Sequence, residues 1–267
     1  AWFLGEFVGD DALTAVTLMF PLYMILVAAS ILVSSGFSSV VARLLGAGQA
    51  AQANAAFMGA LVLALVVSFA FIAVFLAGGR FLVDLATNGS GLLTGFGYAY
   101  ISLMVFSTPL MFLVAVNVDG LRCEGRLRFM TAVTLASGLA NIPLNYLFIV
   151  ILDQGVAGSA YGTIVALAGS FMTLLAYRLA GRAKLSLTLS PGEALTRYWS
   201  RFLALGLPFS LGYVGVSLSA MTVILTLQVW SGAMYEASAG AYGIVTRLMT
   251  FMYLPLLGLS LRFQAIV

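Results

Sequence analysis

Histidine is absent from this chain of 267 residues, and cysteine occurs once, at Cys123. Without histidine, the sequence has no histidine metal ligand, catalytic triad or histidine proton relay. A single cysteine excludes an intrachain disulfide and a thiolate metal cluster. Any proton chemistry within the sequence therefore depends on carboxylates, and it contains only nine Asp and Glu residues.

Charge is scarce as well: 8% of the residues are charged, whereas 62% are hydrophobic. A soluble domain carries about 25% charged residues, so this chain lacks the charge to cover a surface in water. The net charge is only +3, and the basic residues are scattered along the sequence. That distribution disfavours nucleic-acid binding. The composition predicts a polytopic membrane protein whose surroundings are lipids.

Long stretches without charge divide the chain into candidate membrane spans. Each can hold the ~20 apolar residues that a helix needs to cross a bilayer. A span in lipid must be helical, because unpaired backbone groups there cost several kcal/mol each. We therefore expect an all-α fold with about seven spans. They lie near residues 12–33, 56–76, 95–116, 130–151, 158–179, 202–228 and 237–259.

The placement of Lys and Arg predicts how these spans are oriented. One side holds ten of the twelve basic residues: Arg43, Arg122, Arg126, Arg128, Arg178, Arg182, Lys184, Arg197, Arg201 and Arg262. The opposite loops hold only Arg80, together with Glu6, Asp10, Asp11, Asp84, Asp153 and Glu236. The positive-inside rule therefore predicts that the first side is cytoplasmic.

Both ends of the chain indicate a longer protein. It begins at Ala1 without a methionine or the basic segment of a signal peptide, and it stops at Val267 within an apolar pattern. The most polar stretch, 180–200, predicts a cytoplasmic join between two bundles. A weak sequence similarity between 10–15 and 236–241 also favours two bundles, because repeated halves are typical of secondary transporters.

A polar cluster at 141–146 is the strongest candidate site. Asn141 and Asn145 are four residues apart, so they face the same side of one helix. Pro143 between them removes a backbone hydrogen bond and leaves a carbonyl available to an ion or to water. The same pattern is typical of polar side chains that hold membrane helices together, and both interpretations stay open.

Charged residues within or beside the spans are further candidates, because burying charge in lipid is expensive. Arg247 interrupts the last span, and we consider a pathway or gating role and a structural ion pair equally. Asn117, at the end of the third span, is a second possible pathway residue. A solvated salt-bridge cluster is expected from Asp119 and Glu124 with Arg122, Arg126 and Arg128.

Several segments, taken in order, resemble MATE (multidrug and toxic compound extrusion) transporters. They are 41–48, 121–126, 141–149, 155–160, 205–208 and 241–247. The resemblance implies a two-lobe helical bundle, of which this chain covers roughly helices two to eight. Residues 1–180 would form most of the N-terminal lobe, 181–200 the inter-lobe linker, and 201–267 the start of the C-terminal lobe.

The resemblance also implies an antiporter of the bacterial inner membrane that exports organic cations or drugs in exchange for H⁺ or Na⁺. It would need no cofactor and would be a monomer when complete. In the DinF-like branch an ion site lies in the N-terminal lobe, and Tyr100, Asn141, Asn145 and Thr163 match its positions. The helix-one aspartate of that site would precede Ala1. Asn145 stands where the branch has a carboxylate; an amide can ligate Na⁺ but cannot release a proton.

The NorM branch instead uses a glutamate on helix seven. The comparable stretch, 209–220, offers only Ser210, Ser217 and Ser219 as polar side chains, so the coupling ion stays open. A flippase or exporter of lipid-linked oligosaccharides or metabolites from the same superfamily is the alternative. An integral membrane enzyme is disfavoured, because no span contains a pair of carboxylates and the sequence has no histidine.

Overall fold

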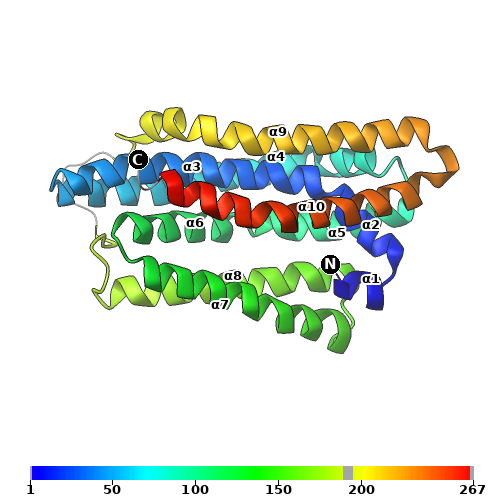
Figure 1. The fold of residues 1–267 in the computed structure, drawn as a ribbon, viewed down its shortest axis with the longest axis horizontal. Coiled ribbons are helices and arrows are strands. Elements are labelled where there is room, and N and C mark those ends of the chain that lie inside the picture. Colours follow the sequence, from blue (N-terminus) through cyan, green and yellow to red (C-terminus); the bar gives the residue numbers. More distant parts are fainter. Residues whose placement is uncertain (1, 189–194, 265–267) are drawn as a thin grey trace.

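A computed structural model describes residues 2–188 and 195–264 of the protein as a bundle of long helices (Figure 1). Neither range contains a β-strand. The helices are α1 (Trp2–Phe7), α2 (Asp10–Leu18), α3 (Phe20–Gly46), α4 (Ala50–Ala86), α5 (Gly91–Phe106), α6 (Thr108–Cys123), α7 (Leu127–Tyr146), α8 (Gly155–Leu179), α9 (Trp199–Trp230) and α10 (Tyr235–Gln264). A π-helical turn, Leu147–Ile151, follows α7, and a 3₁₀ turn, Gly232–Met234, precedes α10.

The long helices turn alternately at two ends of the bundle (Figure 1). One end, here called the basic end, carries the exposed side chains of Arg43, Arg122, Arg126, Arg128, Arg182, Lys184, Arg197 and Arg201. The other, the acidic end, carries Glu6, Asp10, Asp11, Asp84 and Asp153. The predicted segregation of basic and acidic loops is thus present in the fold.

Among the described residues, five helical segments are long and apolar enough to cross a membrane: α3, α4, α7 with its π-turn, α8 and α9. The pair α5 and α6, bent by 49° at Ser107, is long and apolar enough only when the two helices are taken together, and would then make a sixth span. The spans expected at 56–76, 130–151, 158–179 and 202–228 fall within these helices. The seventh falls in α10, which is a helix but is not among the spans of the described residues.

Two helix breaks, which the sequence did not lead us to predict, follow from prolines. Pro21 has no N–H with which to continue a helix from α2, so the chain turns at Met19 and restarts at Phe20. The span expected at 12–33 is therefore wrong in position, and α3 takes its place. Pro109 likewise bends the segment at Ser107.

Hydroxyl groups satisfy the carbonyls that the second break exposes. Thr108 Oγ1 donates to the carbonyl of Val105 at 2.6 Å, the group that the missing N–H of Pro109 would have bonded. Ser107 Oγ donates to the carbonyl of Met104 at 2.8 Å. A bend inside lipid is stable only when such groups are paired again, and these two side chains do so.

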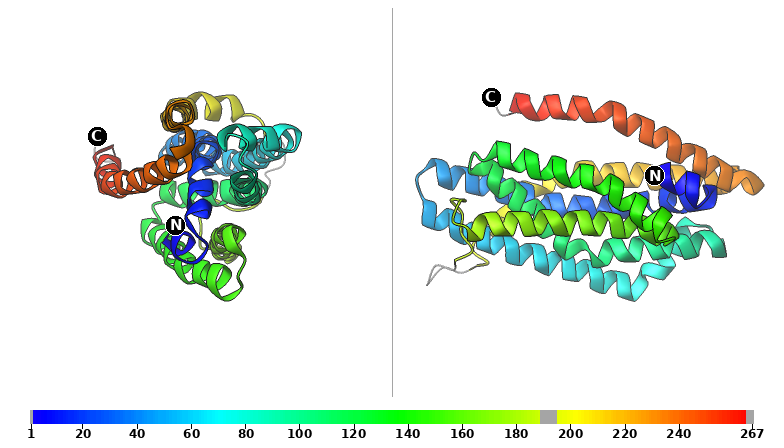
Figure 2. Two further views of the ribbon diagram at one scale, coloured as in Figure 1. Left: turned by 90° about the vertical axis from the view of Figure 1, so that its right-hand side faces the viewer. Right: turned by 90° about the horizontal axis from the view of Figure 1, so that it is seen from below.

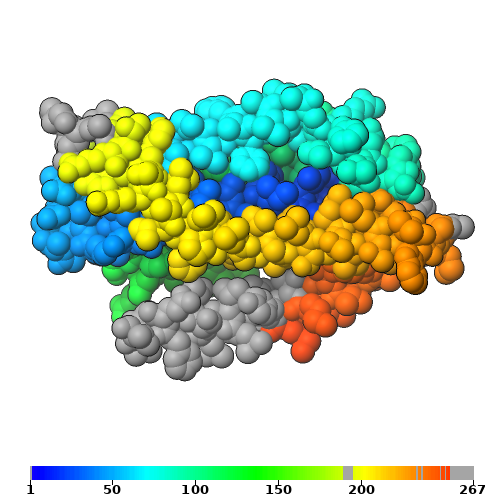
Figure 3. Space-filling model, turned by 90° about the horizontal axis from the view of Figure 1, so that it is seen from above, coloured from blue at the N-terminus to red at the C-terminus, as the bar shows by residue number. Residues whose placement is uncertain are grey.

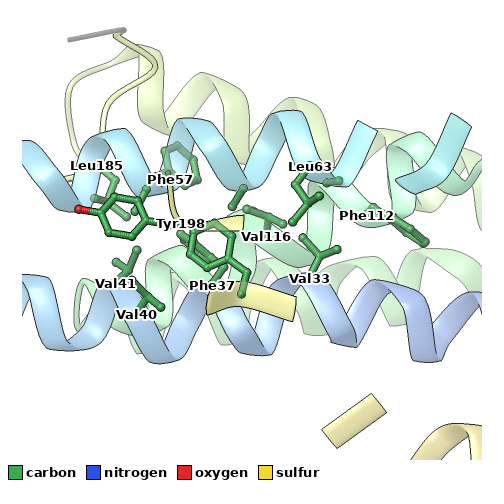
Figure 4. Close-up of a cluster of buried hydrophobic side chains, with 14 of the residues drawn as sticks. Val33, Phe37, Val40, Val41, Phe57, Leu63, Phe112, Val116, Leu185 and Tyr198 are labelled. Carbon is green, nitrogen blue, oxygen red and sulfur yellow. The ribbon is translucent and has the colours of Figure 1, made fainter. Parts of the chain in front are cut away.

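The main apolar core lies where α3, α4, α6 and α9 meet (Figure 4). Phe37, Phe57, Phe112 and Phe202 are fully buried there. Glycines let α9 lie directly on α3: a Cβ at Gly36 would overlap the carbonyl of Phe202, and one at Gly206 would overlap that of Leu32. Such small-residue contacts are typical of membrane helix pairs. Figure 3 shows α3 lying between α9 and α4.

The last helix is attached mainly through its first half. Gly240 and Gly243 of α10 face Thr14 and Thr17 of α2. Beyond these contacts α10 diverges from the rest of the bundle (Figure 2).

Candidate ion and substrate sites

Asn141, Asn145 and Thr163 meet where α7 and α8 pack together. Asn145 Nδ2 donates to Asn141 Oδ1 at 2.8 Å, and Asn141 Nδ2 donates to Thr163 Oγ1 at 3.2 Å. Thr163 Oγ1 in turn donates to the carbonyl of Ser159 at 3.1 Å. The structure therefore joins three of the four predicted ion-site residues in one hydrogen-bonded chain.

This series of hydrogen bonds ends at Asn145, whose side-chain oxygen is an unpaired acceptor. Asn145 Oδ1 is buried and has no hydrogen-bond partner among the described residues. Leaving a buried acceptor unsatisfied costs about 1–3 kcal/mol. Each asparagine NH₂ group uses one of its two N–H donors within this hydrogen-bonded series, and none of these bonds goes to Asn145 Oδ1. Asn145 Oδ1 is thus available to an added donor or a cation.

The backbone of α7 is irregular on both sides of Asn145. Pro143 lies inside the helix, so the carbonyl four residues before it lacks its usual amide donor. The π-turn follows directly, and the N–H of Leu152 bonds to the carbonyl of Leu147 at 2.9 Å. Single π-turns within helices occur frequently at functional sites, and this one fixes the end of α7 beside the asparagines.

Glycines on α8 bring that helix against the site. Gly158 and Gly162 are four residues apart, a spacing that permits close approach of membrane helices. A Cβ at Gly162 would lie 2.8 Å from Asn145 Oδ1, and one at Gly158 would lie 2.8 Å from the carbonyl of Phe148. This spacing is visible in the sequence, but the prediction of the site did not use it.

Tyr100 lines a central cavity of about 190 Å³ between α2, α3, α5 and α10. Its walls combine aromatic rings with hydroxyl groups, supplied by Val16, Thr17, Phe20, Tyr23, Tyr100, Tyr242, Gly243 and Thr246. A larger cavity, of about 540 Å³, is lined by Trp2, Gly5, Glu6, Asp10, Leu13, Ile244 and Leu248. Aromatic rings and carboxylates are both favourable surroundings for an organic cation.

The remaining predicted residues lie elsewhere. The side chain of Arg247 is outside what the structure describes, although its backbone belongs to α10. Ser217 donates to the carbonyl of Pro21 at 2.7 Å, and Ser210 to that of Leu207 at 2.9 Å. Asn117 is buried at the basic end, where Asn117 Oδ1 accepts from Arg178 Nε at 2.6 Å.

Asn117 belongs to a buried ion-pair network that the sequence did not lead us to predict. Arg178 Nη1 donates to Glu124 Oε1 at 2.9 Å, and these two side chains are 1% and 0% exposed. The same Nη1 donates to the carbonyl of Leu185, and the guanidinium lies 4.2 Å from the Phe57 ring centre. Glu124 Oε2 accepts from the backbone N–H of Lys184 at 2.6 Å.

The expectation for Glu124 was therefore wrong, because this carboxylate is buried rather than solvated. Its partner is Arg178, 54 residues away and counted as a loop residue from sequence. Only the fold brings α6 and α8 together. The other expected pair is present: Asp119 and Arg122 lie 3.0 Å apart, with Arg122 half exposed.

The linker that follows α8 is fastened to the bundle by the same region. Asn54 Nδ2 donates to the carbonyl of Thr188, and Asn54 Oδ1 accepts from the N–H of Ser186, both at 2.7 Å. Leu185 is buried between these contacts. Residues 184–188 are thus held against the basic end of the bundle by hydrogen bonds.

The sequence is similar to a known protein family and to individual transport proteins. The MatE family model matches residues 1–147. The chain is 26% identical to the probable multidrug resistance protein YoeA of Bacillus subtilis, over 97% of this chain and 56% of that protein. It is 25% identical to a FAD transporter of Shewanella oneidensis, over 94% of this chain and 56% of that protein.

Solved structures agree on the fold. The MATE multidrug transporter DinF-BH is 26% identical, with a TM-score of 0.86 over 96% of this chain and 57% of that one. An inward-facing MATE family transporter gives 22% identity and a TM-score of 0.85, again over 96% and 57%. The chain thus spans a little over half the length of the proteins it matches.

Proposed function

Because the chain belongs to the MatE family, we propose that its complete protein is a secondary antiporter that exports organic cations or drugs in exchange for H⁺ or Na⁺. The similarity to a probable multidrug resistance protein and to a multidrug transporter structure supports this function. So does the central cavity, whose aromatic and hydroxyl lining suits a flat cation. Small organic cations are accordingly its proposed partners.

The observation that carries the ion coupling is the buried, unpaired Asn145 Oδ1. A Na⁺ ion or a protonated carboxyl group would satisfy it. Amide and hydroxyl oxygens can ligate Na⁺, whereas neither Asn141 nor Asn145 can give up a proton. On these residues alone Na⁺ is the better occupant; coupling to H⁺ would require a carboxylate from outside the described chain.

We further propose that residues 1–180 form most of an N-terminal lobe, 181–200 the inter-lobe linker, and 201–267 the start of a C-terminal lobe. Transport would proceed by rocking the lobes around the cavity. Ion binding would shift the equilibrium between the two states by its difference in affinity for them. The close contact of α9 with α3 would then keep the basic end closed in the state described.

The proposed setting is the bacterial inner membrane, with the basic end cytoplasmic. The protein would be a monomer surrounded by lipid, without a cofactor, an enzymatic activity or a nucleic-acid partner. In this proposal the coupling ion binds at Asn141 and Asn145.

The test uses the complete gene in a bacterium that lacks its major pumps. Cells expressing it should accumulate less of a fluorescent organic cation, and the difference should vanish when the Na⁺ gradient or the proton gradient is removed. Asn141→Leu should abolish export while membrane expression is unchanged, because it removes both hydrogen bonds of Asn141. Thr222→Val, on an exposed face of α9, is the matched control.

A second candidate, export of a metabolite, rests on the similarity to a protein named as a FAD transporter. If no cation is exported by protein confirmed in the membrane, flavin and other metabolite export should be assayed in the same cells. Export of a metabolite but of no cation would replace the first proposal.

A further inference from the structure

Four exposed basic side chains gather where two turns meet at the basic end. Arg126 belongs to the turn between α6 and α7, Arg128 to the first turn of α7, and Arg182 and Lys184 to the segment just after α8. Figure 1 shows both turns on the same side of that end. We call these four residues the cation patch.

Three contacts fix the two turns relative to each other. Arg126 Nη2 donates to the carbonyl of Arg182 at 3.2 Å. The rings of Phe129 and Tyr177 stack with centroids 3.9 Å apart. Glu124, buried against Arg178, holds the backbone N–H of Lys184. The patch is therefore set on an ordered support.

No carboxylate neutralises the patch within the described residues. The two ion pairs found there are Asp119 with Arg122 and Glu124 with Arg178, and neither includes a patch residue. Both carboxylates near these turns are thus already paired with other arginines. Four positive charges remain exposed where these two parts of the chain meet.

The surface next to the patch is apolar and faces outward. Leu127 is 53% exposed and Leu179 is 70% exposed, on the first turn of α7 and the last turn of α8. Phe129 and Tyr177 lie at the same level, where aromatic residues mark the boundary between headgroups and acyl chains. Basic side chains above such a surface match a lipid headgroup above its acyl chains.

We propose that Arg126, Arg128, Arg182 and Lys184 form a binding site for the phosphate headgroup of an anionic phospholipid, whose acyl chains lie along α7 and α8. Guanidinium groups can bind a phosphate through two parallel hydrogen bonds. A lipid bound here contacts both the α6–α7 turn and the linker. This proposal is independent of the transported substrate and of the coupling ion.

Native mass spectrometry of the complete protein tests the site, with phosphatidylglycerol and phosphatidylcholine as probes. The patch variant is Arg128→Gln, Arg182→Gln and Lys184→Gln, which keeps the Arg126 contact and the backbone bond of Lys184. The matched control is Arg43→Gln, Arg197→Gln and Arg201→Gln, which removes three exposed charges elsewhere at the basic end. Thermal unfolding of each variant shows whether it is folded.

Wild type and control should retain phosphatidylglycerol over phosphatidylcholine, and the patch variant should lose at least ~10-fold in phosphatidylglycerol affinity. Restoring charge with Arg128→Lys and Arg182→Lys should restore binding even if the glutamine variant proves unstable. Equal losses in the patch and control variants would overturn the proposal, since they would report total charge only. Displacement of the lipid by millimolar inorganic phosphate would also overturn it, in favour of a free-anion site.

Discussion

At the scale of single residues, the environment of Asn145 depends on a glycine in the neighbouring helix. Gly162 presents no side chain to Asn145, whose side-chain oxygen and backbone nitrogen lie 2.8 Å and 3.1 Å from where a Cβ would be. The space left by this missing side chain is what allows Asn145 to reach Asn141. The geometry of the proposed ion site therefore depends on the absence of a side chain at Gly162 of α8, as well as on Asn141 and Asn145 themselves.

Gly162→Ala should displace Asn145 and impair ion binding. Overpacking of a tight contact costs about 1–3 kcal/mol, so ion affinity should fall by at least ~5-fold. The measurement is the Na⁺ or H⁺ dependence of substrate export by the complete protein. Gly169→Ala on the same helix is the control, because nothing lies within 4 Å of its Cβ position. Equal ion dependence in both variants would remove Asn145 from the ion site.

The sequence predicted part of this residue-scale arrangement. The spacing of Asn141 and Asn145 placed them on one helical face, and in the structure Asn145 donates a hydrogen bond to Asn141. Glu124 was assigned wrongly because its partner, Arg178, is distant in sequence. Spacing rules describe one helix at a time, whereas a buried ion pair between helices depends on how those helices pack.

At the scale of the element, hydroxyl groups stabilise the bend between α5 and α6, and one of them stands in for a missing backbone donor. Thr108 replaces the N–H that Pro109 cannot provide to the carbonyl of Val105. The sequence predicted a single span at 95–116 because the charge-free stretch is continuous there. Proline indicates that a helix is perturbed, but it does not give the size of the bend, which is 49° in the structure.

Thr108→Val should destabilise the protein by about 1 kcal/mol, because it removes the hydroxyl donor from the carbonyl of Val105 and leaves that group only the backbone N–H of Ser107. Thermal unfolding in detergent measures the change. Thr222→Val in α9 is the matched control: Thr222 Oγ1 donates to the carbonyl of Leu218, which lies in an uninterrupted helix and has a backbone donor as well. An unfolding midpoint for Thr108→Val equal to that of the control would show that the hydroxyl is dispensable at the bend.

At the scale of the whole molecule, composition and charge placement were enough to predict an all-α membrane bundle with basic and acidic ends. They were not enough to predict which helices touch. The contact between α3 and α9 joins segments about 170 residues apart through Gly36 and Gly206. Glycine has no apolar pattern of its own, and although a regular glycine spacing can be read in a sequence, the helix that packs against it is seen only in the structure.

Gly206→Ala should force α9 away from α3 at the basic end, since the added Cβ would overlap the carbonyl of Leu32. Cysteines introduced at the exposed positions Arg43 and Arg201 in a Cys123→Ser background would carry spin labels, and pulsed electron resonance would measure the distance between them. The distance distribution should shift to longer values, because the closed contact loses about 1–3 kcal/mol. Gly212→Ala, with nothing within 4 Å of its Cβ position, should leave the distribution unchanged. Identical distributions for the two variants would mean that the α3–α9 contact does not hold the basic end closed, and the proposed rocking motion would need another closing contact.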